Sequence, residues 1–169
     1  MRKKIRLNGY DYSRTGCYFV TICVKDRHEM LGNIGANVGA IINRPHNLIE
    51  LSEYGHIAKT AIHEIPSHYE GITIDKYVIM PNHIHMILTL RSGDDGRLII
   101  APTRVPAIIQ QLKRNVTKQI GFSMWQKSYH DRIIRNKNEY RQIWRYIDEN
   151  LEKWPEDEYY GGKENAGNG

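Results

Sequence analysis

Residues 72–90 constrain the fold more than any other part of the sequence. The segment is rich in β-branched and other apolar residues and carries few charges, a composition typical of a buried strand. We therefore predict one long strand over Ile72–Leu90. It should contain an irregularity at Pro81-Asn82, because proline cannot donate a hydrogen bond to a neighbouring strand.

Two histidines give this strand a defined orientation. His83 and His85 are two residues apart, so their side chains leave the same face of an extended chain. The apolar Ile84, Met86 and Leu88 leave the opposite face. Two imidazoles side by side form half of a metal site, while an ordinary pair of polar histidines on a half-exposed face is the alternative.

Helix and strand patterns alternate along the rest of the chain. Apolar periodicity and composition predict strands at 17–24 and 125–134 and helices at 52–65, 103–120 and 138–151. Ser52 is a suitable N-cap for the first helix, Pro66 should end it, and Gly121 should stop the second. Residues 32–51 should form a loop or a weak hairpin, and residues 91–102 a mobile connection.

The order of these elements indicates the fold class. Strand, helix, long strand, helix, strand and helix favour an antiparallel α+β fold. The specific prediction is a ferredoxin-like antiparallel sheet with helices packed on it and the two histidines on a central strand. A doubly wound parallel sheet is disfavoured, because the sequence has no glycine-rich strand-to-helix turn.

Length and charge divide the chain into a body and a tail. The 169 residues suffice for one domain, which we expect over residues 1–154. Residues 155–169 are acidic, end in a glycine-rich stretch and should be disordered. The body is therefore more basic than the net charge of +5 implies, which is compatible with a polyanionic partner.

Composition also bounds the location of the protein. Hydrophobic residues make up 40% of the chain and charged residues 25%, which excludes a membrane protein and a fully disordered one. The sequence contains no run of about 18 apolar residues and no signal-peptide pattern. We therefore expect a cytoplasmic protein without a membrane partner.

The last predicted helix presents a tyrosine and an amide together. Its expected buried stripe consists of Tyr140, Ile143, Trp144, Ile147 and Leu151. Tyr146 lies off this stripe, and Asn150 follows it by one turn on the same side of the helix. The pair would border the sheet surface, where a cleft would form. A simple surface tyrosine is the alternative.

Basic and aromatic residues are interleaved in the second half of the chain. Aromatic rings can stack on unpaired bases while lysine and arginine hold phosphates. The candidate DNA-binding residues are Lys113, Arg114 and Lys118 in the second helix, followed by Lys127, Arg132, Arg141 and Arg145. A solvated basic face with the aromatic residues in the core is the alternative.

Taken together, these features resemble the single-tyrosine transposases of the HUH class, in particular the bacterial REP-associated tyrosine transposases. The resemblance runs from Arg6 to Trp154. It rests on LNGYDYSRTGCYFVTICVKDR near the start, YVIMPNHIHMIL in the middle and WQKSYHDRIIRNKNEYRQIWRYIDEN towards the end. The middle piece contains the histidine-hydrophobe-histidine motif that names the class.

The resemblance implies a role for individual residues. His83 and His85 match the two metal-binding histidines, and Tyr146 matches the nucleophilic tyrosine on the C-terminal helix. Asn150 matches an amide that completes the metal shell. Tyr140 matches a packing tyrosine of the same helix. This chain departs from the family in having Leu151, where members often have proline, after that amide.

The resemblance also implies an activity, a cofactor and a partner. The expected reaction is cleavage and rejoining of single-stranded DNA through a 5′-phosphotyrosine, with Mg²⁺ or Mn²⁺ as cofactor. The expected partner is DNA with a hairpin and a short unpaired flank. The protein would act as a monomer or a homodimer, in the bacterial cytoplasm and associated with the nucleoid.

Two other functions compete with this one. A related protein that binds hairpin DNA or RNA without cutting it would keep the fold and lose the covalent product. A metal enzyme of another class would use His83 and His85 with a third carboxylate ligand, for which Asp131 and Asp148 are the candidates.

Overall fold

Within residues 16–35, 49–91 and 105–160, which a computed structural model describes, four strands form one sheet that carries three α-helices. In chain order the elements are β1 (Gly16–Cys23), η1 (Lys25–Arg27), β2 (Gly32–Ile34), β3 (Ile49–Leu51), α1 (Glu53–His68), β4 (Ile72–Ile79), β5 (His83–Leu90), α2 (Val105–Ile120), β6 (His130–Ile134), α3 (Lys137–Glu149) and η2 (Trp154–Glu156). The strands β2 and β3 form a separate antiparallel pair at the described ends of the predicted weak hairpin.

The main sheet has the strand order β4-β5-β1-β6, and every neighbouring pair is antiparallel. Helix α1 lies between β1 and β4 in the chain, and α2 lies between β5 and β6. This β-α-β-β-α-β succession is that of a ferredoxin-like fold. The predicted α+β class and ferredoxin-like sheet are therefore confirmed, with the histidines on the interior strand β5.

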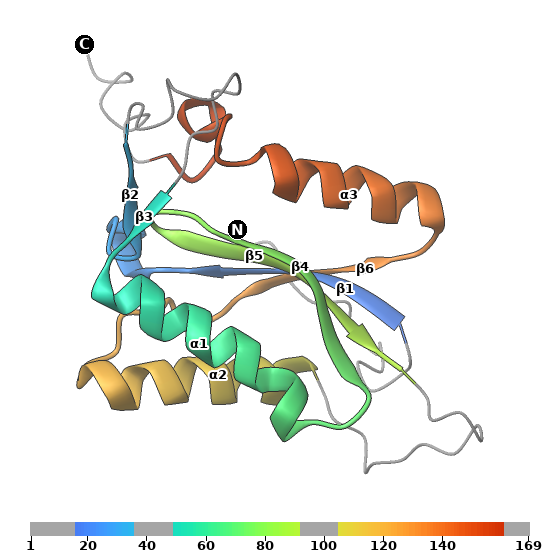
Figure 1. Ribbon diagram of the computed structural model, residues 1–169, viewed down its shortest axis with the longest axis horizontal. Helices are drawn as coiled ribbons and strands as arrows, with labels where there is room; N and C mark the ends of the chain where they lie inside the picture. The colour runs from blue at the N-terminus through green and yellow to red at the C-terminus, as the bar shows by residue number, and fades with distance from the viewer. Residues whose placement is uncertain (1–15, 36–48, 92–104, 161–169) are drawn as a thin grey trace, which may run out of the picture.

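The sheet separates two layers of helices. Helices α1 and α2 cover one face and α3 covers the other (Figure 1). Ile84, Met86 and Leu88 point into the larger core on the α1 and α2 side, whereas Ile87 packs with Ile143 of α3. Side chains alternate along β5, so His83 and His85 lie on the face opposite Ile84, Met86 and Leu88, as predicted, and this face is the one that α3 covers.

The single long strand predicted over residues 72–90 is wrong. The chain reverses at Pro81-Asn82, and β4 pairs with β5 as a hairpin. The Met80 amide donates to the His83 carbonyl at 2.8 Å across the turn. The carbonyl of Pro81 accepts from the Leu31 amide. Strand β5 is buried along its whole length, and β4 is partly buried with Ile residues at both ends. The apolar residues therefore continue on each side of the turn and hide the reversal.

Two element boundaries differ most from the prediction. Pro66 does not end α1, which continues to His68 after beginning at the predicted cap Ser52. Pro66 lies in the last turn, so the helix extends only two residues beyond it. The strand expected over 125–134 is shorter, because β6 begins at His130 and Trp125 forms only an isolated bridge with Val24.

Some expectations fall outside the described ranges. The predicted connection 91–102 is described only at Arg91. Among the described residues, no helix has both the length and the apolar character needed to cross a membrane.

Candidate active site

The centre of the candidate site is a buried pair of imidazoles on β5. His83 and His85 are 0% and 1% exposed, and their Nε2 atoms lie 3.0 Å apart. Both nitrogens therefore point to one place on the α3 side of the sheet. Imidazole nitrogens held in this way are the commonest protein ligands of transition-metal ions.

Asn82 sets the tautomer of His83. The Asn82 amide nitrogen donates to the carbonyl oxygens of Arg27 at 3.1 Å and Tyr159 at 2.7 Å. Its Oδ1 lies 2.8 Å from Nδ1 of His83, and an amide oxygen can only accept. His83 therefore carries its proton on Nδ1 and directs a free lone pair from Nε2 into the site.

His85 is held from the neighbouring strand. The Thr21 hydroxyl on β1 lies 2.7 Å from His85 Nδ1, so Nε2 faces the site. Burial lowers the pKa of His85 to about 3. Burial, followed by the neighbouring His85, also lowers the pKa of His83 well below its usual value. Both imidazoles are therefore neutral at physiological pH, the state in which they can bind a metal.

Helix α3 brings Tyr146 to the histidine pair. The Tyr146 hydroxyl lies 3.3 Å from Nε2 of His85, and its ring meets Phe19 of β1 edge-on at 6.0 Å between centroids. Burial and the negative charge of Asp157 raise the pKa of Tyr146, while a hydrogen bond from Asn150 opposes the shift. The predicted tyrosine thus faces the histidines although 42% of it is exposed.

Asn150 is buried at the end of α3, one turn after Tyr146. Its Oδ1 has no hydrogen-bond partner among the described residues. A buried acceptor without a donor is costly, and a bound cation would satisfy it. This orphaned oxygen is the structural observation that favours the predicted role of Asn150.

Asp157 is a candidate ligand that the sequence analysis did not identify. Its carboxylate is buried, and Oδ2 lies 3.9 Å from Nε2 of His83. One ligand atom each from His83, His85 and Asp157 lie within 4.8 Å of one another. In the sequence, Asp157 is one acid of the run 156–158, and nothing in that run marks it as the inward one.

Asp157 reaches the site because the beginning of the expected tail is folded. Residues 154–156 form η2 with Trp154 buried, and the Tyr159 ring lies 4.5 Å from the His83 ring between centroids. The expected disorder from residue 155 therefore does not hold for residues 155–160. Residues 161–169 lie outside the described ranges.

The donor set fits a divalent cation that prefers nitrogen and oxygen ligands. Two neutral imidazoles, one amide oxygen and one carboxylate suit Mn²⁺ and, with further oxygen ligands, Mg²⁺. The alternative carboxylates do not join this set. Asp148 pairs with Lys76 at 2.7 Å, and Asp131 lies opposite Val20, whose side chain faces the α1 and α2 core.

Tyr140 has a separate role on the same helix. Its hydroxyl donates to Oδ2 of Asp75 at 2.9 Å, and Asp75 also accepts from Thr89 at 2.8 Å. Burial and this hydrogen bond raise the pKa of Tyr140 to about 12. Tyr140 therefore anchors α3 to the sheet, as its match to a packing tyrosine implies.

The candidate DNA-binding residues fall into two groups on opposite sides of the sheet. Lys113, Arg114 and Lys118 belong to α2, on the face away from His83 and Tyr146 (Figure 1). Lys113 also donates to the carbonyl oxygens of Gln126 and Ser128, each at 2.8 Å. These three residues are therefore not brought together with the site.

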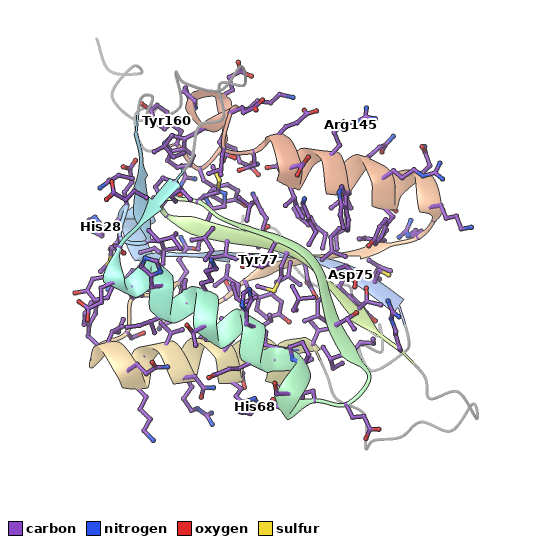
Figure 2. All side chains as sticks on the ribbon, in the orientation of Figure 1. His28, His68, Asp75, Tyr77, Arg145 and Tyr160 are labelled. Atoms are coloured by element: carbon purple, nitrogen blue, oxygen red, sulfur yellow. The ribbon has the colours of Figure 1, made fainter. Side chains whose placement is uncertain are left out.

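The second group lies on the site's side of the sheet or in the loop before β6. Arg141 and Arg145 are exposed on α3, and Figure 2 shows Arg145 on the outer side of that helix. Arg132 of β6 is exposed and contacts Glu139 at 3.3 Å. Lys127 is exposed in the loop between α2 and β6.

A cavity of about 540 Å³ opens beside Tyr146. Its walls come from β1, β5, β6, α3 and the segment after η2. The lining residues include Phe19, Thr21, His85, Arg132, Gln142 and Tyr146. A molecule in this cavity would touch the candidate nucleophile directly.

The chain is similar to two proteins of Haemophilus influenzae. An uncharacterized protein is 32% identical over 177 residues, covering 94% of this chain and 93% of the relative. A protein assigned to the REP-associated tyrosine transposases is 24% identical over 144 residues, covering 81% of this chain and 70% of the relative. No protein-family model matches the chain.

A solved structure shares the fold. It is that of a REP-associated tyrosine transposase bound to a REP hairpin, with a TM-score of 0.63 and 23% sequence identity. The match covers 88% of this chain and 73% of the solved one. At this identity the likeness establishes a common arrangement of sheet and helices.

Proposed function

Because this chain belongs to the REP-associated tyrosine transposases, we propose that it cleaves and rejoins single-stranded DNA next to a hairpin. The nucleophile would be Tyr146, and the covalent intermediate a 5′-phosphotyrosine. The observation that carries the proposal is the position of the Tyr146 hydroxyl, which lies 3.3 Å from Nε2 of His85. His85 is buried and neutral and belongs to the histidine pair.

The proposed chemistry is an exchange of phosphodiester bonds. The Tyr146 oxygen forms a bond to phosphorus, the bond from phosphorus to the 3′ oxygen breaks, and that oxygen leaves as a 3′-OH. The reverse attack by another 3′-OH rejoins the strands without an external energy source, because the phosphotyrosine linkage conserves the free energy of the phosphodiester bond that was broken. Since its pKa is raised, Tyr146 is protonated at neutral pH and loses its proton during the attack.

A divalent cation would be held by His83 and His85 with Asn150 and Asp157. When bound, it supplies positive charge that stabilises the transition state at the scissile phosphate. Asn82 directs the Nε2 lone pair of His83 at this place, and Thr21 orients the His85 ring so that its Nε2 faces the same place. Preorganised partners of this kind avoid reorienting the ligands during the reaction.

The unpaired DNA would lie along the α3 side of the sheet. Arg132, Arg141 and Arg145 are the proposed phosphate contacts, because they are exposed on the site's side of the sheet. The family's hairpin substrate and the basic body of the chain support this choice of partner. Such a protein would work on DNA in the bacterial cytoplasm, associated with the nucleoid.

Formation of a covalent adduct tests the proposal. The protein is incubated with labelled hairpin DNA from the flanks of its own gene and Mn²⁺ or Mg²⁺, then run on a denaturing gel. We expect an adduct with the wild type, and its loss in Tyr146→Phe and His83→Ala. Tyr140→Phe is the matched control and should keep the adduct, because Tyr140 bonds to Asp75 instead.

Two results would contradict this assignment. An adduct that persists in Tyr146→Phe would place the nucleophile elsewhere. Tight hairpin binding without any adduct, over several flanking sequences and both metals, would identify a binding module that does not cut.

A further inference from the structure

The cavity beside Tyr146 is larger than the attack on a phosphate requires. Its volume of about 540 Å³ falls in the range of roughly 300–1,000 Å³ that is usual for ligand pockets. Tyr146 and His85 line it together. Whatever fills this cavity therefore lies directly against the reacting groups.

Phe19 provides a flat apolar wall for the cavity. It lies on β1 between Tyr18 and Val20, which face the opposite core. Its ring stacks on His85 at 5.2 Å and 29°, and meets Tyr146 edge-on. Phe19 is only partly buried and lines the cavity. Stacking of an unpaired base on such a ring is expected to tighten binding about tenfold.

Gln142 provides a polar group on the helix side. It precedes Tyr146 by one turn of α3, is exposed and lines the same cavity. Its side-chain amide forms no hydrogen bond with any described residue. A glutamine amide donates and accepts at once, which suits the edge of a nucleic-acid base.

Arg132 completes the cavity on the β6 side. It lies directly opposite Phe19 in the register of β1 and β6, and its side chain is 62% exposed. An arginine across from an aromatic ring can hold the phosphate of the nucleotide whose base stacks on that ring. Stacking, edge recognition and phosphate contact therefore converge on a single nucleotide.

We propose that this cavity takes one unpaired base of the DNA flank, stacked on Phe19 and read at its edge by Gln142. The inference rests on the proposed function and makes these two residues determinants of cleavage-site sequence. Since Tyr146 lines the same cavity, the bound nucleotide is one that directly flanks the scissile phosphate.

A thermodynamic cycle between protein and DNA tests the stacking. Hairpin oligonucleotides carry a single abasic nucleotide, moved in turn through every position of the unpaired flank, and their affinities are measured without metal so that no cleavage occurs. We expect one position at which base removal weakens wild-type binding about tenfold. At that position, Phe19→Ala should bind the intact and abasic DNA equally well.

Two further variants control this measurement. Phe122→Ala removes a 42% exposed ring that packs on Tyr54, and it should behave as wild type. Phe19→Leu keeps apolar bulk if Phe19→Ala does not fold, and it should lose most of the same coupling. Gln142→Ala should bind oligonucleotides with each of the four bases at the coupled position within about twofold, whereas the wild type prefers one.

The outcomes separate this inference from the proposed function. If the wild type forms the adduct but no position couples to Phe19, or base preference survives in Gln142→Ala, the base pocket is overturned and the function stands. If coupling is found without an adduct, the pocket stands and the cleavage activity fails. Absence of any hairpin affinity overturns both.

Discussion

At the residue scale, the side chains behind the histidines matter as much as the histidines themselves. Asn82 has its amide nitrogen occupied by two backbone carbonyls, so its oxygen must accept from His83. One of those carbonyls belongs to Tyr159. A single asparagine thus fixes the tautomer of His83 and also ties the segment after η2 to the site.

Asp157 should influence both the metal site and the nucleophile. Asp157→Asn removes a negative charge that raises the pKa of Tyr146, so that pKa should fall. Ionisation of Tyr146 would then shift to lower pH. Difference absorbance titrations between each protein and its Tyr146→Phe counterpart measure this shift, because only the Tyr146 signal remains.

Glu158→Gln is the control for the same experiment. Glu158 also raises the pKa of Tyr146, but more weakly than Asp157 does, so its removal should cause a smaller downward shift. The Mn²⁺ affinity, measured by calorimetry, also distinguishes the two variants, because only Asp157→Asn should weaken Mn²⁺ binding. Equal Mn²⁺ affinity in both variants would remove Asp157 from the ligand set.

At the element scale, close contact between backbones fixes where α1 begins. The Ser52 side chain accepts from the Gly55 amide at 3.1 Å and donates to the Met30 carbonyl at 2.6 Å. Gly55 then lies against the chain near Leu31. The small β2–β3 sheet and the start of α1 are therefore joined through backbone groups that leave no room for a side chain.

Gly55→Ala should destabilise the protein, although alanine is the better helix former in isolation. A Cβ at this position would lie 2.0 Å from the Leu31 carbonyl oxygen, and overpacking of this kind costs about 1–3 kcal/mol. Urea denaturation should show a lower midpoint. Gly35→Ala is the control, because a Cβ there meets nothing within 4 Å. An unchanged midpoint in Gly55→Ala would refute this packing.

At the scale of the whole molecule, the sheet divides the basic residues between two faces. The cations of α2 lie on one side, while the site and the exposed arginines of α3 lie on the other (Figure 1). A short unpaired strand that reaches Tyr146 passes along the second side. Contacts from α2 would require DNA that wraps around the edge of the sheet.

Charge reversal tests this division. Arg145→Glu should weaken hairpin binding and lower the slope of log affinity against log salt by about one, the change expected for one lost phosphate contact. Arg114→Glu makes the same change of charge on α2 and should have little effect at physiological salt. Equal losses in both variants would show that DNA covers both faces. Fluorescence anisotropy over a range of salt concentrations provides the measurement.

The buried histidines should make global stability depend on pH. Above pH 6.5 the imidazoles are neutral in the folded and unfolded states, so they contribute no pH dependence. Below it the unfolded chain takes up protons that folded His83 and His85 do not, because burial lowers their pKa values. The free energy of unfolding should fall with decreasing pH, by up to about 1.4 kcal/mol per pH unit for each histidine.

Urea denaturation of the metal-free protein between pH 7.5 and pH 5 measures this dependence. His85→Gln removes one of the two groups and should show a shallower fall over the same range. The same slope in the variant and the wild type would assign the pH dependence to other residues.

Local patterns determined a large part of this protein. The two-residue repeat of a strand put His83 and His85 on one face and their apolar neighbours on the other, and the helical repeat put Tyr146 and Asn150 on one side of α3. The element order gave the ferredoxin-like sheet. These features follow from backbone geometry within one element, so they can be read without knowing what the element packs against.

Only the tertiary structure decided which of these faces meet. The apolar run at 72–90 is compatible with one strand or two, and the pairing of β4 with β5 in one sheet selected the hairpin. Asp157 joins the site because Trp154 is buried and Asn82 holds Tyr159, contacts that span long distances in the chain. The cations of α2 are on the far face because α2 packs there. Each outcome depends on contacts between distant residues, and a pattern within one element does not contain them.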